Sequence, residues 1–185
     1  MFEQLLASLA RSLDGARIPY MIIGGQAVLL HGLVRVTDDV DLTLGVDAGQ
    51  CARVLGALRE AGLEPRVPNP EQFVRRAMIL PALHPEHRVR VDVTFSFTPY
   101  EQQAIEHAVV RQRDGYPVRF ATAEDLIIHK LVAGRAQDIQ DIEGIVLRRG
   151  RQLDLQYLRQ WVKQFAGLEG KAHLQQQLEA LLIET

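Results

Sequence analysis

Ile23-Gly24-Gly25, followed after a short apolar segment by Arg35-Val36-Thr37-Asp38-Asp39-Val40-Asp41-Leu42, is the most informative part of this sequence. A glycine pair closes one apolar run, and an Asp-x-Asp sequence opens the next one. A third carboxylate, Asp92, stands inside a later alternating run, Val89–Phe95. Three acidic residues on strands together with a glycine turn are the parts that a metal-dependent phosphoryl-transfer site requires.

The composition is that of an ordinary globular protein, with 47% hydrophobic and 24% charged residues among 185. This length suits one domain, or one domain with a small appendage. The formal net charge of −2 provides no global basic field, so a polyanionic partner would need a local patch.

Cysteine usage and hydropathy indicate the compartment. The single cysteine, Cys51, cannot form an internal disulfide, and we expect it to be a small buried apolar residue in a reducing cytosol. The N-terminus lacks the basic region of a signal peptide, and no run approaches the roughly 20 apolar residues of a membrane helix. We therefore expect a cytoplasmic protein with no membrane segment.

Hydrophobic periodicity predicts an α/β first part and an all-α second part. We place the change near Thr122, where Thr122-x-x-Asp125 resembles a capping box. The predicted organisation is a core over 1–121 and a helical region over 122–185 that packs on it. The predicted strands are 20–23, 40–46, 78–80, 89–97, 108–111 and 118–120, with a loop at 81–87. The predicted helices are 2–13, 26–31, 50–61, 99–107, 123–132, 137–149, 155–165 and 172–183.

The strand period places the two acids of Asp-x-Asp together. Asp39 and Asp41 project from one face of their strand, about 7 Å apart, and repel each other unless a cation lies between them. Asp92 lies on the polar face of its own strand with Arg90 and Thr94, so the three carboxylates converge if the two strands are neighbours. Hard oxygen ligands in this number suit Mg²⁺, and two such ions could clamp a displacement at phosphorus.

Gly24 and Gly25 supply the other half of such a site. Glycine permits positive φ and close approach of backbone amides to a phosphate, and a helix starting just after them favours an anion there. Gln26 could add a side-chain donor. Each feature also has a purely structural interpretation: a tight turn, a solvated strand end, and an ion pair of Asp92 with Arg88 or Arg90.

Taken together, Ile23-Gly24-Gly25, Asp39-Val40-Asp41-Leu42 and Val91-Asp92-Val93 resemble the motifs of the nucleotidyltransferase superfamily with the DNA polymerase β-like fold. Its pattern is h-G-[GS], then D-h-[DE]-h, then h-[DE]-h on a later strand. The intermediate Arg35-x-Thr37-x-Asp39-x-Asp41 looks like the minimal bacterial branch that includes AbiEii-type toxins of type IV toxin–antitoxin systems.

The resemblance implies an α/β (α+β) fold, in which a mixed β-sheet core flanked by helices is followed by a C-terminal helical region. It also implies two Mg²⁺ ions (or Mn²⁺), a bound NTP, and transfer of a nucleoside monophosphate to a hydroxyl. Carried over, Asp39, Asp41 and Asp92 would bind metal, with Asp92 helping to activate the acceptor. Gly24 and Gly25 would hold the triphosphate, although many members have Ser at the position of Gly25.

A second signature lies in the helical half, where Lys130 is followed by Arg135, Asp138 and Asp141. It resembles the K-h…R-x-x-D-x-x-D motif of the same branch. The resemblance implies that Lys130 meets a phosphate in the cleft and that Asp138 and Asp141 orient Lys130 or the acceptor. The alternatives are a lysine whose stem covers the core while its ammonium reaches water, and two acids stabilised by a helix N-terminus.

The remaining polar residues leave alternatives open. Arg35 and Thr37 precede the acids and are assigned to the nucleotide, although Arg35 could instead pair with Asp38. Arg148-Arg149-Gly150-Arg151 is either a solvated helix end or a contact for a nucleic-acid backbone. The six histidines have no zinc-ligand spacing.

We therefore predict a cytoplasmic nucleotidyltransferase whose acceptor is a tRNA 3′ end or a protein hydroxyl, and which acts as a toxin with a cognate antitoxin. The alternatives are an antibiotic-modifying enzyme of the aminoglycoside type and a degenerate module that binds a nucleotide or partner without chemistry.

Overall fold

The computed structural model describes residues 1–32, 36–96 and 98–183. The chain divides into two compact units, each described here by itself. The first comprises Met1–Gln26 and Val36–Ala121. The second comprises Ala27–Arg35 and Thr122–Thr185, as far as these ranges are described.

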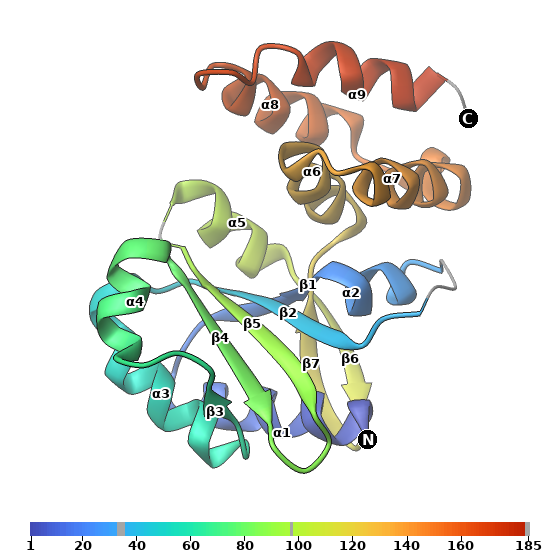
Figure 1. Ribbon diagram of the computed structural model, residues 1–185. Helices are drawn as coiled ribbons and strands as arrows, with labels where there is room; N and C mark the ends of the chain where they lie inside the picture. The colour runs from blue at the N-terminus through green and yellow to red at the C-terminus, as the bar shows by residue number, and fades with distance from the viewer. Residues whose placement is uncertain (33–35, 97, 184–185) are drawn as a thin grey trace. The chain divides into compact units, whose positions relative to one another are not determined.

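The first unit contains a mixed β-sheet with the strand order β3-β4-β5-β2-β1-β7-β6 (Figure 1). The β1/β7 and β2/β5 pairs are parallel, and the other pairs are antiparallel. This architecture confirms the predicted mixed α/β fold. The strands are β1 (Tyr20–Ile23), β2 (Asp39–Leu44), β3 (Glu64–Pro65), β4 (Ile79–His84), β5 (Val89–Phe95), β6 (Val109–Arg113) and β7 (Tyr116–Phe120).

The neighbouring strands β2 and β5 show alternating burial. Val40 and Leu42 on β2, and Val91 and Val93 on β5, are completely buried, whereas the residues between them are partly or fully exposed. One face of each strand therefore enters the core and the other carries polar side chains.

Helix α1 packs against α3 and against β7, and its completely buried Leu9 and Leu13 contribute to the core (Figure 1). Cys51, the first residue of α3, is buried as predicted, and burial raises the pKa of its thiol. The helices of this unit are α1 (Phe2–Gly15), α3 (Cys51–Glu60), α4 (Pro70–Ala77) and α5 (Pro99–His107), with a 3₁₀ turn η1 (Ala48–Gln50) before α3. Helix α2 (Gly24–Leu30) begins in the first unit and ends in the second.

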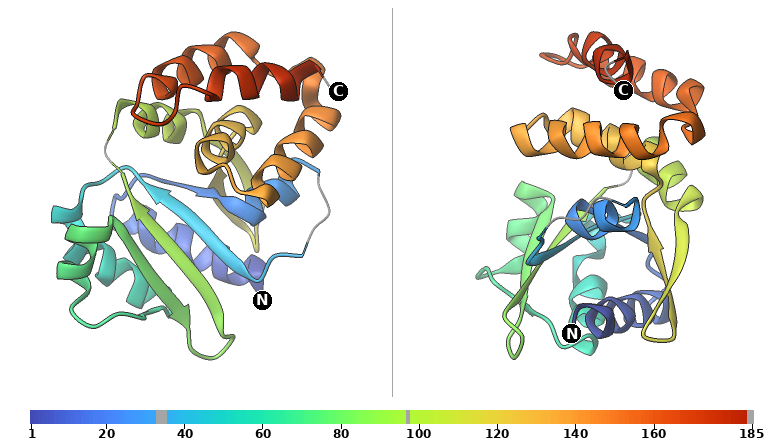
Figure 2. Two further views of the ribbon diagram at one scale, coloured as in Figure 1. Left: turned by 45° about the horizontal axis from the view of Figure 1, so that its top comes forward. Right: turned by 90° about the vertical axis from the view of Figure 1, so that its right-hand side faces the viewer.

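In its described residues, the second unit is entirely helical (Figure 2). The predicted cap at Thr122 is present, because its hydroxyl accepts a hydrogen bond from the Asp125 amide at 3.0 Å. The Tyr157 hydroxyl donates to Asp125 at 2.7 Å and ties α8 to α6. The helices are α6 (Ala123–Ala133), α7 (Ala136–Arg149), α8 (Leu155–Ala166) and α9 (Leu174–Ile183), with a 3₁₀ turn η2 (Gly150–Gln152) after α7.

The region before β5 differs most from the sequence-based expectation. The predicted loop at 81–87 is shorter, because β4 continues to His84 and pairs residue by residue with β5. Met78 is not in a strand but ends α4 in a left-handed conformation. Helix α4 was not predicted because it is short and its apolar side consists only of Phe73, Val74 and Ala77, of which Val74 alone is buried.

Smaller differences concern the ends of elements. Helix α2 starts at Gly24 itself instead of after the glycine pair, and α9 starts at Leu174. The predicted strand at 89–97 ends at Phe95, and Phe97 lies outside the described residues. No helix in the described ranges combines the length and the apolar character needed to cross a membrane.

Candidate active site

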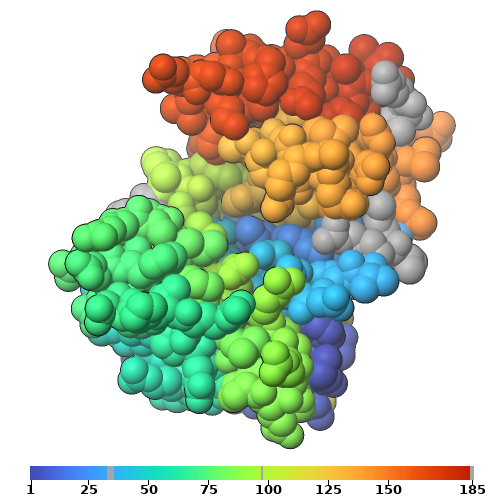
Figure 3. Space-filling model, viewed as in Figure 1, coloured from blue at the N-terminus to red at the C-terminus, as the bar shows by residue number. Residues whose placement is uncertain are grey.

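Asp39 and Asp41 lie on the polar face of β2, as the alternation predicted. Both are half-buried, while Val40 and Leu42 between and beside them face the core. The segment leading into β2 lies at the surface beside β5 (light blue and yellow-green, Figure 3). The two carboxylates therefore have access to a ligand from solvent.

The parallel pairing of β2 with β5 brings Asp92 beside Asp41. The register aligns Asp39 with Arg90 and Asp41 with Asp92. Because hydrogen-bonded strands lie about 4.8 Å apart and in-register side chains share a face, the Asp92 carboxylate belongs to the same polar surface. The two acidic strands are therefore neighbours, which is the condition under which the sequence placed the three carboxylates together.

Gly24 lies against Asp41 on the other side of β2. Strand β1 pairs antiparallel with β2 and places Ile23 opposite Asp41, so the next residue turns over the carboxylate. A Cβ on Gly24 would lie 1.9 Å from Asp41 Oδ2, and the residue has φ of +61°. Both the conformation and the contact require glycine here.

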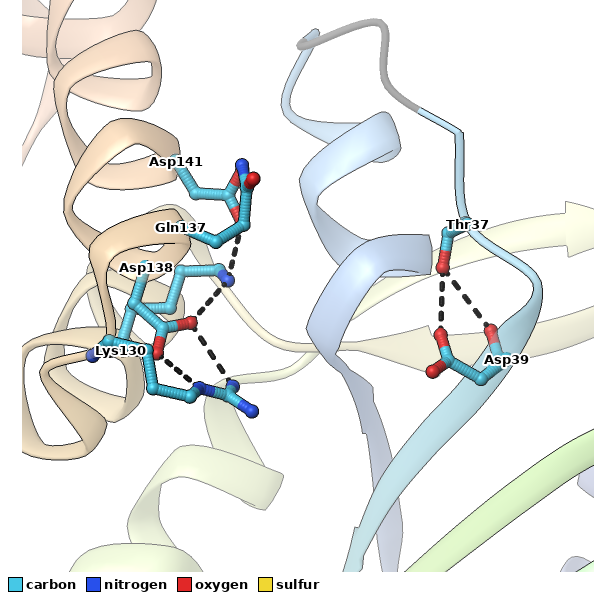
Figure 4. A network of polar contacts seen from close by, with 7 residues as sticks. Thr37, Asp39, Lys130, Gln137, Asp138 and Asp141 are labelled. Carbon is cyan, nitrogen blue, oxygen red and sulfur yellow. Dashed lines mark hydrogen bonds and ion pairs between the residues drawn. The ribbon is translucent and has the colours of Figure 1, made fainter.

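Thr37 and Arg90 hold the Asp39 carboxylate. The Thr37 hydroxyl donates to Asp39 Oδ1 at 2.9 Å (Figure 4), and an Arg90 guanidinium nitrogen lies 3.9 Å from Asp39 Oδ2. Thr37 thus orients the Asp39 carboxylate through this hydrogen bond. The sequence suggested Arg90 as a partner of Asp92, but the register places it opposite Asp39 instead.

Asp92 makes no hydrogen bond or ion pair with any residue that the structure describes. Neither Arg88 nor Arg90 forms an ion pair with Asp92. The structure therefore does not support the alternative in which Asp92 only pairs with one of these arginines. A half-buried carboxylate next to a second carboxylate favours a cation or a hydrogen-bond donor from a ligand.

The three aspartates provide oxygen ligands of the kind that a divalent metal ion prefers. As the side chains stand, no group of three or more His, Cys, Asp or Glu among the described residues is arranged to hold a metal ion. Mg²⁺, however, is usually bound by one or two carboxylates and completes its shell with water and substrate phosphates. The in-register pair of Asp41 and Asp92 fits that requirement without a closed protein cage.

In the second unit, Lys130 lies between two aspartates of α7 (Figure 4). Its Nζ is 3.1 Å from Asp138 Oδ1 and 2.6 Å from Asp141 Oδ2. The lysine is 6% exposed and both aspartates are 1% exposed. The ammonium is therefore buried and paired, so the alternative in which it reaches water does not describe this structure.

Arg135 completes the cluster. Its Nε donates to Asp138 Oδ2 at 2.6 Å, and the Arg135 backbone amide donates to the same oxygen at 3.2 Å. Burial raises the pKa of Asp138, but the hydrogen bonds and charges of Arg135 and Lys130 outweigh it, and the net pKa is lowered. Asp138 thus binds Lys130 and also caps the start of α7. The contact with Lys130 and the position at a helix N-terminus, which the sequence offered as alternatives, are both present.

The other predicted site residues show less. Gly25 is buried and Gln26 is half-buried at the start of α2. Arg35 lies outside the described residues. In the second unit Trp161 is buried, and burial raises the pKa of Tyr157, whose hydroxyl donates to Asp125.

Comparison with protein families identifies the group to which the sequence belongs. The model of a family described as "Nucleotidyltransferase of unknown function (DUF6036)" matches residues 2–180. The chain belongs to this family. It is therefore a nucleotidyltransferase, in agreement with the superfamily that the motifs indicated, and its glycine pair and three aspartates are the residues that resemble the superfamily motifs. No curated protein matches the chain.

Solved structures share the fold. The solution structure of the antibiotic-resistance factor ANT(2″)-Ia has a TM-score of 0.59 and 17% identity, over 93% of this chain and 97% of that one. ANT(2″)-Ia in complex with adenylyl-2″-tobramycin has a TM-score of 0.58 and 17% identity, over 88% and 97%. An antigenic nucleotidyltransferase-like protein from Paracoccidioides brasiliensis has a TM-score of 0.58 and 18% identity, over 98% and 88%.

Proposed function

We propose that this nucleotidyltransferase moves a nucleoside monophosphate from a Mg²⁺-bound NTP to a hydroxyl acceptor and releases pyrophosphate. The observation that carries the proposal is the register of β2 and β5, which aligns Asp41 with Asp92 on one polar surface next to Gly24. The family match supports a transferase that uses a nucleotide.

Each residue has a stated role in this proposal. Asp39, Asp41 and Asp92 would hold the metal, and Thr37 would keep Asp39 oriented through its 2.9 Å hydrogen bond. When bound, two Mg²⁺ ions would polarise the attacking and leaving oxygens of the displacement. Asp92 would accept a hydrogen bond from the acceptor hydroxyl, and the amides after Gly24 would donate to the triphosphate.

The proposed acceptor is the 3′ end of a tRNA or a protein hydroxyl. This choice rests on the resemblance of Arg35-x-Thr37-x-Asp39-x-Asp41 to the AbiEii-type branch, and it would make the protein the toxin of a type IV toxin–antitoxin system acting in the cytoplasm. In that case a cognate antitoxin would suppress the transfer.

A second candidate is modification of an aminoglycoside. ANT(2″)-Ia is described as an antibiotic-resistance factor, and its fold matches this chain over almost the whole of both proteins. Because a shared fold hosts many functions, the candidate needs its own acceptor test.

The first experiment measures thermal stability with each Mg²⁺-NTP. A ligand at about 100 times its Kd adds about 2.7 kcal/mol to the native state. We expect a stabilising shift with one NTP, and its loss in the Asp39→Asn/Asp41→Asn variant. The control Glu60→Gln/Glu106→Gln removes the same charge from two exposed positions and should keep the shift.

The labelled NTP identified in this way is then offered to RNA, to total protein and to tobramycin. Label on RNA or protein supports the first acceptor, whereas label on tobramycin supports the second candidate. A folded wild-type protein that no Mg²⁺-NTP stabilises, and that labels nothing, would refute the transferase mechanism and favour a non-catalytic binding module.

A further inference from the structure

Three arginines gather where α7 ends and η2 begins. Arg148 and Arg149 are in the last turn of α7, and Arg151 follows in η2. Arg148 and Arg151 are exposed and Arg149 is half-buried. None of the three forms a salt bridge with a carboxylate of the described residues, and Arg149 instead donates to the Gln152 side chain at 3.1 Å. Their charge is therefore not neutralised within the described chain.

The arginines line a pocket of about 430 Å³, a volume within the roughly 300–1,000 Å³ of ligand-binding pockets. No acidic side chain from the described ranges contributes to its wall. The rest of the wall is largely apolar, and its apolar side chains are Val146, Leu147, Leu155 and Leu182. Leu147 is 72% exposed, which leaves an apolar side chain open at the rim.

Helix-dipole stabilisation explains only part of this arrangement. Basic residues in the last turn of a helix interact favourably with its C-terminus, and Arg148 and Arg149 satisfy that requirement. Arg151 lies beyond the helix, and neither the dipole nor a surface ion pair requires a pocket whose wall is partly apolar. The combination instead fits a ligand with negative charges and apolar parts.

We infer that this pocket binds a single-stranded nucleic acid. Phosphates would lie on the guanidinium groups, and an unstacked base would lie on a guanidinium plane and the leucine side chains. Since the net charge of the whole chain is −2, a strand has to be held by a local patch such as this one. RNA and DNA share the phosphodiester chemistry and are separated by experiment.

The test measures fluorescence anisotropy of a labelled oligouridylate of roughly 12 nucleotides, a span typical of single-strand sites. The full chain is titrated at salt concentrations from about 50 to 200 mM. In Arg148→Gln/Arg149→Gln/Arg151→Gln we expect the affinity to fall roughly tenfold or more at the lower salt. The slope of log K against log[salt] should become shallower by about 2, because three single-strand contacts are lost.

Two variants isolate the local effect. Arg59→Gln/Arg75→Gln/Arg76→Gln removes the same charge from exposed positions of the first unit and should bind like the wild type. Arg148→Lys/Arg149→Lys/Arg151→Lys keeps the charge, so the salt slope should remain while the affinity falls moderately. An oligothymidylate that binds less well than oligouridylate identifies RNA as the strand, and equal binding identifies the backbone as the recognised element.

The inference does not rest on the proposed transfer, and the experiment separates the two. Asp39→Asn/Asp41→Asn should bind the oligonucleotide like the wild type, and the triple glutamine variant should still be stabilised by Mg²⁺-NTP. Absent binding by the wild type, or an equal loss in the Arg59/Arg75/Arg76 control, would overturn the inference. Displacement by free UMP at the same concentration of nucleotide units would overturn it in favour of a mononucleotide site.

Discussion

Substitution of Gly24 by alanine perturbs the candidate active site at one atom. The new Cβ would lie 1.9 Å from Asp41 Oδ2, whereas real Cβ contacts are not shorter than about 3.0 Å. The carboxylate therefore has to retreat by about 1 Å, or β1 and β2 have to separate. In the first case the Asp41 carboxylate leaves its place beside Asp92, and in the second case the Gly24 turn leaves the carboxylate.

Two magnitudes follow from this geometry. A left-handed conformation costs an alanine about 1–2 kcal/mol, which we expect as a loss of unfolding free energy. Displacing a metal-binding carboxylate by about 1 Å should lower the transfer rate by about 100-fold. Weaker stabilisation by Mg²⁺-NTP should accompany the lower rate.

Two other glycines provide matched controls. Gly115 has φ of +73° in the β6–β7 turn with open space around its Cβ position, so Gly115→Ala imposes the strain without the clash. Gly56 lies in α3, also with open space, and Gly56→Ala should stabilise by about 0.5–1 kcal/mol. Neither control should change activity.

Urea denaturation, Mg²⁺-NTP thermal shifts and single-turnover transfer are compared for the three variants. The difference between Gly24→Ala and Gly115→Ala isolates the displacement of Asp41 from the backbone strain. If Gly24→Ala keeps wild-type nucleotide binding and transfer, the close packing of Gly24 on Asp41 has no functional role and the reasoning is refuted.

Further outcomes are expected at other positions. Asp92→Asn should abolish transfer and change stability by no more than about 0.5 kcal/mol, because Asp92 is half-buried without a partner among the described residues; a melted variant would contradict this. Lys130→Met should lower the free energy of unfolding by about 3–5 kcal/mol in urea denaturation, because it leaves buried carboxylates without their lysine. Arg135→Gln, at a side chain that is 77% exposed, should lower it by about 1 kcal/mol or less. Burial lowers the pKa of His129 from 6.5 to about 4. As the pH falls from 6.5 to 4, His129 is therefore protonated in the unfolded chain but not in the folded chain, and the free energy of unfolding should fall by about 3 kcal/mol. His129→Phe should flatten that pH profile, and an unchanged profile would show that His129 does not cause it.

Much of the candidate site was predictable from the sequence. The alternation around Asp39 and Asp41 predicted a strand with both carboxylates on one face, and β2 has that arrangement. The glycine pair predicted a backbone with positive φ, and Gly24 has φ of +61°, although the group it lies against is the Asp41 carboxylate. These features depend on residues close together in the chain, where side-chain period and backbone freedom determine the geometry.

Other features could not be predicted. The partner of Arg90 depends on the register between β2 and β5, since a shift of one residue would exchange its neighbour. Helix α4 has an apolar side of only three residues, which is too short to predict a helix, so its place follows from its packing against β4. The prediction of a loop over 81–87 was also wrong, because pairing with β5 extends β4 through Pro81 to His84.

The sequence by itself determined most of the strands and helices, the superfamily, and the identity of the acidic residues, because these depend on local periodicity and on short motifs. Only the tertiary structure decided that Asp92 lies beside Asp41, that Gly24 closes over that carboxylate, and that three arginines without an ion pair among the described residues line a pocket. These arrangements join residues distant in the chain, and they are determined by strand register and helix packing, which no local pattern contains.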